Sequence, residues 1–461
     1  MDMYDEEQIV EKIRSLYAEK KYSKLKKDLN ALNAADAAAV LEQFDEGDRM
    51  VLFRLLSKEN AAETFVEFDN DTQQSLIHTF SDAELQEVFD ELYLDDTVDI
   101  IEEMPANVVR RILSNTDKET RSAINTLLRY PEDSAGSIMT TEFVHLKRDM
   151  TVEDAIKRIK RTAVDKETIY TCYVTDNFRK LLGVTTVKEL LLHKDTDVID
   201  DFMEKNVIYI NTLDDQEVVA NQFDKYNFLA MPVCDMEERL VGIITIDDAL
   251  DVLREESTED IQRMAAIVPN DRPYLKTGVL ETFKKRMPWL LILMISATFT
   301  QLIITSFEEK LAAVVVLTSF IPMLTGTGGN SSSQAASTII RSLSLGEVNY
   351  KDIFRIIGKE AGVGRALGRR RAGVQVCKNL LFDRLLLQNL AVTIPVALAV
   401  SLTLIVEVLV AKVIGASLPV IVKKIGFDPA VVANPLITTI LDSVSLLIFF
   451  QIATLVIPQL R

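Results

Sequence analysis

The feature that most constrains this chain is a single carboxylate, Asp442, inside an apolar run from Ala433 to Pro458. Asn434, Thr438 and Ser445 are spaced so that they share one helical face with Asp442. The run is long enough to cross the hydrocarbon core of a bilayer as a helix. A charged side chain at that depth is costly unless it faces a bundle interior or a water-filled path. We therefore predict that Asp442 lies on an ion path through a membrane.

Charge divides the chain into two regions. Residues 281–461 contain 10 acids and 18 bases, which leaves 59 acids and 33 bases in residues 1–280. Such an acidic region disfavours nucleic acid as a partner and suits divalent cations, because hard cations prefer carboxylate oxygens. Ordinary solubility explains the same composition. The acidic N-terminal sequence MDMYDEEQIV does not resemble a signal peptide, so we expect this region to lie in the cytoplasm.

Residues 35–128 show a helical pattern that repeats about every 24 to 26 residues, as in stacked helical repeats. The segments LEQFDEGDRMVLFRLL, FVEFDNDTQQSLIHTF and ELYLDDTVDIIEEM superpose with Phe44, Phe68 and Leu94 in register. Each unit reads as a pair of helices with an acidic turn, at Asp45, Asp69 and Asp95, between them. We predict an all-α superhelical domain over residues 1–130.

Residues 131–253 contain a second repeat, in which YVTDNFRKLLGVTTVKELL matches PVCDMEERLVGIITIDDAL. Strand-like and helical runs alternate in each copy, which predicts a tandem α/β module. The pattern resembles a pair of CBS domains, regulatory modules that often bind adenine nucleotides or metals. The resemblance implies that Thr245 and Asp248 hold the ribose of ATP or another adenine nucleotide, whereas the first copy has Thr186 and Glu189 instead. Simple capping of the following helix explains Thr245 and Asp248 equally well.

An acidic helix, predicted over residues 254–275, connects this module to the apolar region. Its sequence LREESTEDIQRMAAIV places Glu255, Glu256, Glu259 and Asp260 within about one and a half turns. Like charges this close repel each other unless cations neutralise them. A solvated linker helix would show the same pattern.

Residues 276–461 read as an all-α transmembrane domain. Four spans are predicted over Trp289–Thr305, Leu311–Leu324, Asn389–Gly415 and Ala433–Pro458. Basic residues precede the first span, follow the second and lie between the last two. If all of these are cytoplasmic, the chain must cross once more between about Ile356 and Leu387, which gives five helices.

The segment that must provide the extra crossing contains Arg365, Arg369, Arg370 and Arg371. No carboxylate between Glu360 and Asp383 can pair with them, and arginines at bilayer depth are expensive. Two interpretations are open: a basic regulatory loop, or a locally shifted reading frame between normal flanks, which we favour. Glu407 is a second acid in an apolar span, and we predict that it pairs with Lys412.

Taken together, the chain resembles the MgtE-type magnesium transporters over nearly its whole length. The resemblance rests on the order of the parts and on three phrases, IPMLTGTGGN followed by SSSQAASTIIRSL, EESTEDIQRM, and FDPAVVANPLITTILD. It implies a homodimeric Mg²⁺ channel in the cytoplasmic membrane, with its N-terminal domains in the cytoplasm. The three histidines are scattered, and no nucleophile–base arrangement or phosphate-binding loop suggests an enzyme.

For the pore, the resemblance implies that Asp442 supplies one carboxylate from each subunit. It also implies that a glycine-rich break in the second span, either unwound or packed closely against a neighbour, lines the path together with the polar face around Asp442. The residues implied for the pore are Gly328, Gly329, Asn330, Asn434, Thr438 and Asp442.

For regulation, the resemblance implies that cytosolic Mg²⁺ bridges carboxylates of three parts of the chain and closes the pore. The implied metal ligands are Asp95 and Asp99 in the helical domain, Asp248 and Asp251 in the CBS pair, and Glu256, Glu259 and Asp260 in the connecting helix. Two alternatives stay open: a transporter of Mn²⁺, Co²⁺ or Ca²⁺, and a membrane-anchored metal or nucleotide sensor that conducts nothing.

Overall fold

The computed structural model describes residues 3–163, 166–270, 272, 274–386, 388–431 and 434–460. The chain forms two compact units, residues 1–253 and residues 254–461. Ala433 and Leu387, which bound two of the predicted crossings, lie outside the described residues.

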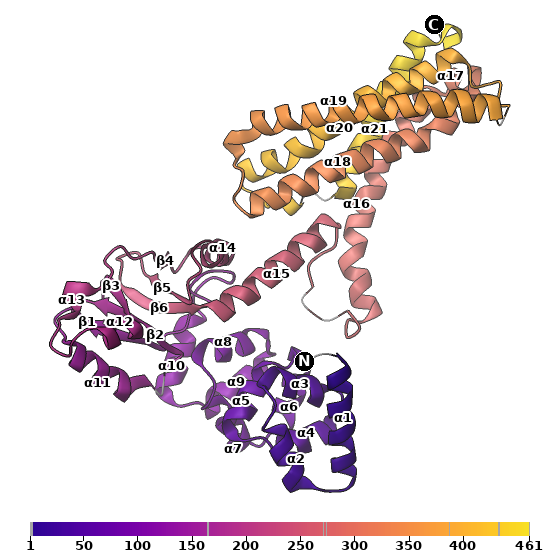
Figure 1. Ribbon diagram of the computed structural model, residues 1–461. Helices are drawn as coiled ribbons and strands as arrows, with labels where there is room; N and C mark the ends of the chain where they lie inside the picture. Colours follow the sequence, from indigo (N-terminus) through magenta and orange to yellow (C-terminus); the bar gives the residue numbers. More distant parts are fainter. Residues whose placement is uncertain are drawn as a thin grey trace. The chain divides into compact units, whose positions relative to one another are not determined.

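The first part of unit 1 is entirely helical (Figure 1). Its apolar faces form a continuous core that includes a cluster of phenylalanine rings, Phe53, Phe65, Phe80 and Phe89. The predicted superhelical pairs are therefore present. The helices are α1 (Met3–Ala18), α2 (Tyr22–Leu29), α3 (Ala34–Glu42), α4 (Glu46–Phe53), α5 (Lys58–Val66), α6 (Asn70–Thr79), α7 (Asp82–Phe89), α8 (Leu94–Glu103), α9 (Ala106–Asn115) and α10 (Lys118–Leu127).

The acidic turns of the helical repeat act as helix caps in two of its three units. Asp45 caps α4 by accepting a hydrogen bond from the backbone N–H of Asp48, and Asp69 caps α6 in the same way through Thr72. In the third unit, however, α8 begins at Leu94, so Asp95 lies inside the first helical turn. The prediction of a turn at Asp95 was wrong, and its carboxylate is not used as a cap.

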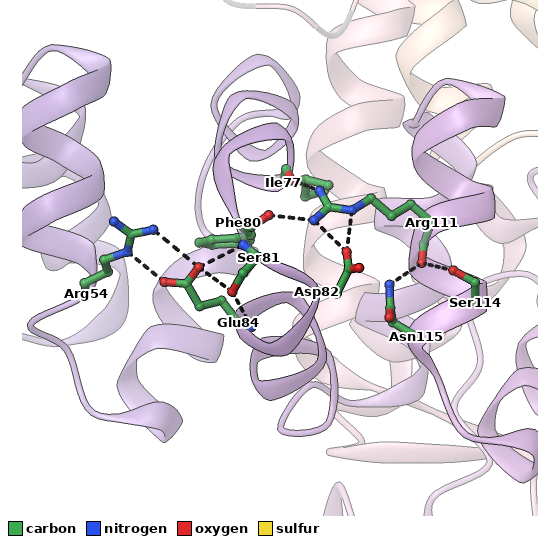
Figure 2. Close-up of polar contacts among 9 residues, drawn as sticks. All are labelled: Arg54, Ile77, Phe80, Ser81, Asp82, Glu84, Arg111, Ser114 and Asn115. Carbon is green, nitrogen blue, oxygen red and sulfur yellow. Dashed lines mark hydrogen bonds and ion pairs between the residues drawn. The ribbon is translucent and has the colours of Figure 1, made fainter.

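Polar contacts tie successive helix pairs together (Figure 2). Arg111 of α9 donates to the carbonyl oxygens of Ile77 and Phe80, both at 2.6 Å, and forms an ion pair with Asp82 at 2.9 Å. It thus satisfies carbonyl groups at the end of α6 and pairs with an acid at the start of α7. Arg54, directly after α4, pairs with Glu84 of α7 at 2.7 Å.

The second part of unit 1 contains two three-stranded sheets, with orders β1-β2-β3 and β4-β5-β6. In each sheet the first pair of strands is parallel and the second pair is antiparallel. The elements are β1 (Phe143–Lys147), α11 (Val152–Thr162), β2 (Thr168–Thr175), β3 (Leu181–Thr186), α12 (Val187–Leu192), α13 (Ile199–Phe202), β4 (Ile210–Asn211), α14 (Gln216–Tyr226), β5 (Ala230–Cys234), β6 (Leu240–Thr245) and α15 (Ile246–Met264).

The register of the strands matches the sequence repeat. Val174 pairs with Gly183 in the first sheet, and the aligned Val233 pairs with Gly242 in the second. A Cβ on Gly242 would lie 2.8 Å from the Thr140 carbonyl oxygen, so glycine is needed where the chain crosses β6. The sequence repeat is therefore a structural repeat.

Unit 2 is helical, and α18, α19, α20 and α21 pack side by side (Figure 1). Three described helices, α16, α20 and α21, are long and apolar enough to cross a membrane. The elements are α16 (Val279–Ser306), α17 (Glu308–Ala313), a 3₁₀ helix (Val315–Phe320), α18 (Ile321–Ser344), a 3₁₀ turn (Tyr350–Asp352), α19 (Ile353–Cys377), a π-helical segment (Lys378–Leu386), α20 (Ile394–Lys424), a 3₁₀ turn (Pro429–Val431), α21 (Asn434–Val456) and a 3₁₀ turn (Pro458–Leu460).

Two of the predicted spans differ from the observed helices. Leu311–Leu324 is divided among α17, a 3₁₀ helix and the start of α18, so the long helix begins at Ile321 and carries the glycine-rich phrase within it. The third span begins later than predicted and continues to Lys424. The predicted span over Ala433–Pro458 agrees with α21.

The arginine-bearing segment forms the regular helix α19. Its contact with α20 uses glycines, because a Cβ on Gly364 would lie 2.9 Å from Leu409 Cα, and a Cβ on Gly368 would lie 3.0 Å from the Ile405 carbonyl oxygen. Glycines at a spacing of four let two helices approach closely in a membrane. The four arginines of this helix, Arg365, Arg369, Arg370 and Arg371, are all exposed.

Candidate ion sites and their relatives

In unit 1, carboxylates from three parts of the sequence meet around α8. Asp248 at the start of α15 acts electrostatically on Asp95, Asp96 and Asp99 of α8, and also on Glu167 just before β2. The predicted ligands Asp95, Asp99 and Asp248 are thus brought together. Asp251, also predicted, is exposed one turn further along α15 and acts on Asp248.

Burial and mutual repulsion raise the pKa values of these carboxyls. Desolvation, helped by Asp248, raises the pKa of Asp96 to about 7 and that of Asp99 to about 8. The same two causes raise the pKa of Glu167 to about 8. Desolvation also raises the pKa of Asp95, which is 4% exposed. A cluster of this kind favours the binding of protons or cations.

The cluster is not a ready-made inner-sphere metal site. Within the described parts of the chain, no three His, Cys, Asp or Glu side chains are arranged to hold one metal ion directly. Mg²⁺ usually keeps several of its waters and binds through one or two carboxylates. A hydrated ion held by one or two carboxylates does not need such a three-ligand arrangement.

The candidate ribose residues Thr245 and Asp248 cap α15. The Thr245 hydroxyl donates to the Asp248 carboxylate at 2.6 Å, and the Thr245 backbone N–H donates to the same oxygen at 3.3 Å. In the first copy Thr186 and Glu189 form a complete capping box. Thr245 and Asp248 still fit a ribose hydroxyl, whereas the surrounding acids fit a phosphate chain only together with a cation.

The predicted acids of the connecting helix lie in the part of α15 that belongs to unit 2. Their contacts are with other residues of that unit. Ser344, at the end of α18, donates to Asp260 at 3.0 Å. Arg263 forms ion pairs with Glu259 and with Asp428, which lies between α20 and α21. Burial raises the pKa of Asp260, and Glu256 acts electrostatically on Arg263. The sequence analysis missed Arg263 and Asp428 because only the fold brings them together.

Most of the predicted pore residues pack α18 against α21. A Cβ on Gly329 would lie 3.1 Å from Thr438 Cγ2, and a Cβ on Gly328 would lie 2.7 Å from Ser445 Oγ. Asn434 Nδ2 donates to Ser337 Oγ at 3.2 Å. The glycines therefore give close packing within a continuous helix, and the alternative of an unwound turn at this point was wrong.

The other two pore residues face outward from the bundle. Asn330 of α18 is exposed, and Asp442 of α21 is half-buried. Among the residues that the structure describes, no hydrogen bond or ion pair engages the Asp442 carboxylate.

The sequence analysis paired Glu407 with Lys412, and this was wrong. Lys412 Nζ donates to Gln334 Oε1 at 3.3 Å, while Glu407 lies fully buried against Gly328 and Ser445.

Fold and site together define a membrane protein with isolated carboxylates among apolar helices and a soluble acidic region that ends in a paired CBS unit. Three family models match these parts in the same order. They are the MgtE intracellular N domain at residues 32–133, the CBS domain at 135–194 and 199–255, and a divalent cation transporter domain at 321–452.

Relatives match the chain almost end to end. The magnesium transporter MgtE of Thermus thermophilus is 35% identical over 94% of this chain and 95% of its own length. The protein of the same name from Bacillus subtilis is 30% identical over 99% of both chains. The chain belongs to the MgtE family of magnesium transporters.

Solved structures resemble the soluble region. The cytosolic domain of the Mg²⁺ channel MgtE in complex with ATP superposes with a TM-score of 0.51 and 34% identity, covering 53% of this chain and 99% of that one. The soluble part of a magnesium transporter gives the same TM-score at 30% identity, covering 55% and 99%.

Proposed function

We propose that this protein is a Mg²⁺ channel that takes up magnesium across the cytoplasmic membrane and is closed by Mg²⁺ on its cytosolic side. The observation that carries the proposal is the position of Asp442, a half-buried carboxylate on an apolar helix with no partner among the described residues. An ion in transit is the natural counter-charge for such a group.

The pore lies between two copies of the chain. One carboxylate per chain is a weak filter, whereas two carboxylates around a shared axis hold a hydrated divalent ion without removing its water. The outward positions of Asn330 and Asp442 on one subunit fit this arrangement. Five crossings, formed by α16, α18, α19, α20 and α21, place the acidic N-terminal region in the cytoplasm, where the basic ends of the helices also lie.

Closure follows from the repulsion between buried carboxylates. Mg²⁺ at the cluster of Asp95, Asp99 and Asp248 stabilises the compact form of the soluble region, since ions bind that form preferentially. The acids Asp251, Glu256, Glu259 and Asp260 carry the signal along α15 to the membrane helices. An adenine nucleotide at Thr245 and Asp248 would bring its own Mg²⁺ into the same cluster. The protein has no enzymatic role in this scheme.

Uptake of Mg²⁺ into sealed vesicles tests the proposal. The wild-type chain should admit Mg²⁺, and Asp442→Asn should abolish uptake, while Glu347→Gln, at an exposed acid beyond the end of α18, should not. Raising Mg²⁺ on the cytosolic face should reduce influx. Equal uptake by wild type and Asp442→Asn would remove Asp442 from the path.

The same vesicles separate the remaining alternatives. Faster influx of Mn²⁺, Co²⁺ or Ca²⁺ than of Mg²⁺ would change the assigned cargo. No flux of any of these ions, with Mg²⁺ still binding to the soluble region, would indicate a non-conducting sensor.

A further inference from the structure

Glu407 is an acid inside the helical bundle that the proposed pore does not use. It lies on α20 with none of its surface exposed, and neither carboxylate oxygen has a hydrogen-bond partner in the described part of the chain. The neighbouring Ser445 hydroxyl is equally buried and unpartnered. A Cβ on Gly328 would lie 2.7 Å from Glu407 Oε1, so the absence of a side chain on α18 makes room for the carboxylate.

A buried carboxylate with no donor requires a compensating charge, because desolvation of an isolated ion costs several kcal/mol or more. Its own helix does not provide one, since Lys412 is engaged with Gln334. The compensation must come from a helix packed against α20.

Arg371 of α19 is in the right place. Its Nη2 donates to Thr327 Oγ1 at 3.1 Å, and Thr327 directly precedes Gly328, against which Glu407 packs. Arg371 is an exposed residue whose positive charge acts favourably on Glu407, while Asp442 of α21 acts with the opposite sign. The guanidinium and the carboxylate therefore approach the same turn of α18 from two neighbouring helices.

We propose that Glu407 and Arg371 are counter-charges, and that Glu407 is a positioning residue for the pore. The pair holds α19 and α20 on the turn of α18 that carries Gly328. It thereby fixes Gly329 and Asn330 in the predicted path, and Ser445, one turn beyond Asp442 on α21. The pair also supplies the carboxylate that the arginine-bearing segment lacks in its own sequence.

A double-mutant cycle on the full-length protein in detergent tests the pairing. Glu407→Gln and Arg371→Gln should each lower the midpoint of thermal unfolding, because each leaves one charge uncompensated. The double variant should lower the unfolding midpoint by less than the sum of the two single decreases. Arg369→Gln, at another exposed arginine of the same helix, is the matched control and should not couple to Glu407→Gln. Additive losses for Glu407 and Arg371 would overturn the pairing.

The positioning role rests on the proposed function and is tested by flux in vesicles. Glu407→Gln should shift the half-saturating Mg²⁺ concentration by at least about twofold, as expected for a residue that acts through others, and adding Arg371→Gln should reverse part of the shift. An unchanged half-saturating concentration would refute the positioning role. If the wild-type protein itself passes no Mg²⁺, the proposed function fails, whereas the unfolding cycle still decides the pairing.

Discussion

Arg263, near the end of α15, forms an ion pair with Asp428 in the segment that joins α20 to α21. Asp428 lies six residues before Asn434, where the helix that carries Asp442 begins. The connecting helix therefore has a direct ionic contact with the segment that leads into the candidate pore helix. This contact, together with that between Asp260 and Ser344, links α15 to the end of α18 and to the segment before α21.

Loss of this ion pair should weaken closure. We expect Arg263→Gln to raise Mg²⁺ influx at high cytosolic Mg²⁺ several-fold, because a partly exposed, charge-assisted contact contributes about 1 kcal/mol or somewhat more. Influx at low cytosolic Mg²⁺ should change little. Thr258→Val on the same helix is the control, since its hydroxyl donates only within its own turn, to the Arg254 carbonyl. A variant that closes as fully as the wild type would contradict a role for this pair.

The acidic cluster of unit 1 predicts a dependence of stability on pH. In the unfolded chain these carboxyls ionise near pH 4, whereas the folded pKa values of Asp96, Asp99 and Glu167 lie at about 7 to 8. The folded form therefore binds more protons between about pH 4 and pH 8, and the free energy of unfolding falls as pH rises through that window.

Thermal unfolding of residues 1–253 in a chelator measures this effect. The midpoint should fall by several degrees between pH 5.5 and pH 8.5, since about 1 kcal/mol corresponds to roughly 2–4 °C for a unit of this size. Mg²⁺ should restore the midpoint at pH 8.5 and have little effect at pH 5.5, where protons already neutralise the cluster. A midpoint that rises with pH would show that other groups dominate.

Asp248 links the cluster to α15, so its neutralisation should mimic a bound cation. We expect Asp248→Asn to raise the unfolding midpoint of unit 1 by a few degrees in chelator at pH 8.5, and to reduce the further gain from Mg²⁺. The amide can still accept the hydrogen bonds from Thr245 that cap the helix.

Asp224→Asn provides the comparison for Asp248→Asn. Asp224 is an exposed acid on α14, and its neutralisation should leave both the midpoint and the response to Mg²⁺ unchanged. An Asp248→Asn variant with the full wild-type response would place the relevant ions elsewhere.

The helical domain depends on Arg111, which joins α6, α7 and α9 (Figure 2). Arg111→Met should leave the Ile77 and Phe80 carbonyl oxygens without this donor and cost about 2–3 kcal/mol, in the range for hydrogen bonds that involve a charged group. The thermal midpoint of unit 1 should therefore fall markedly. Arg110→Met, at the exposed neighbouring position, should have almost no effect, and equal losses for both variants would refute this reading of the network.

The fold of the soluble region could be predicted because the copies of each repeat can be aligned with one another in the sequence. Gly183 and Gly242 occupy equivalent positions in both the sequence and the sheets. In contrast, Asp95 departs from its repeat because α8 starts two residues earlier than the aligned caps imply, and this frees its carboxylate for the cluster. Glu167 could not be assigned to the acidic cluster from the sequence, since most of the acids that act on it are distant along the chain.

The membrane region was less predictable, because hydropathy reports lipid-facing surface and not helix continuity. The helix α18 is polar and glycine-rich since it packs closely against α20 and α21, so the apolar window that precedes it was mistaken for the span. The pairing of Glu407 with Lys412 failed for a similar reason. Proximity along one helix did not decide it, because Lys412 contacts Gln334 of α18 instead.

Close packing of α18 on α20 depends on Gly415. A Cβ at this position would collide with the carbonyl oxygen and the Cα atom of Ser332, which belong to the rigid backbone of α18. Gly415→Ala should therefore force the two helices apart and cost about 1–3 kcal/mol, as overpacking does. We expect a lower unfolding midpoint for the detergent-solubilised chain. Gly362→Ala on α19, where an added Cβ has open space, should be neutral or slightly stabilising because alanine favours helix. An unchanged midpoint in Gly415→Ala would mean that α18 and α20 can move apart with no loss of stability. The position of α18 would then not depend on this contact.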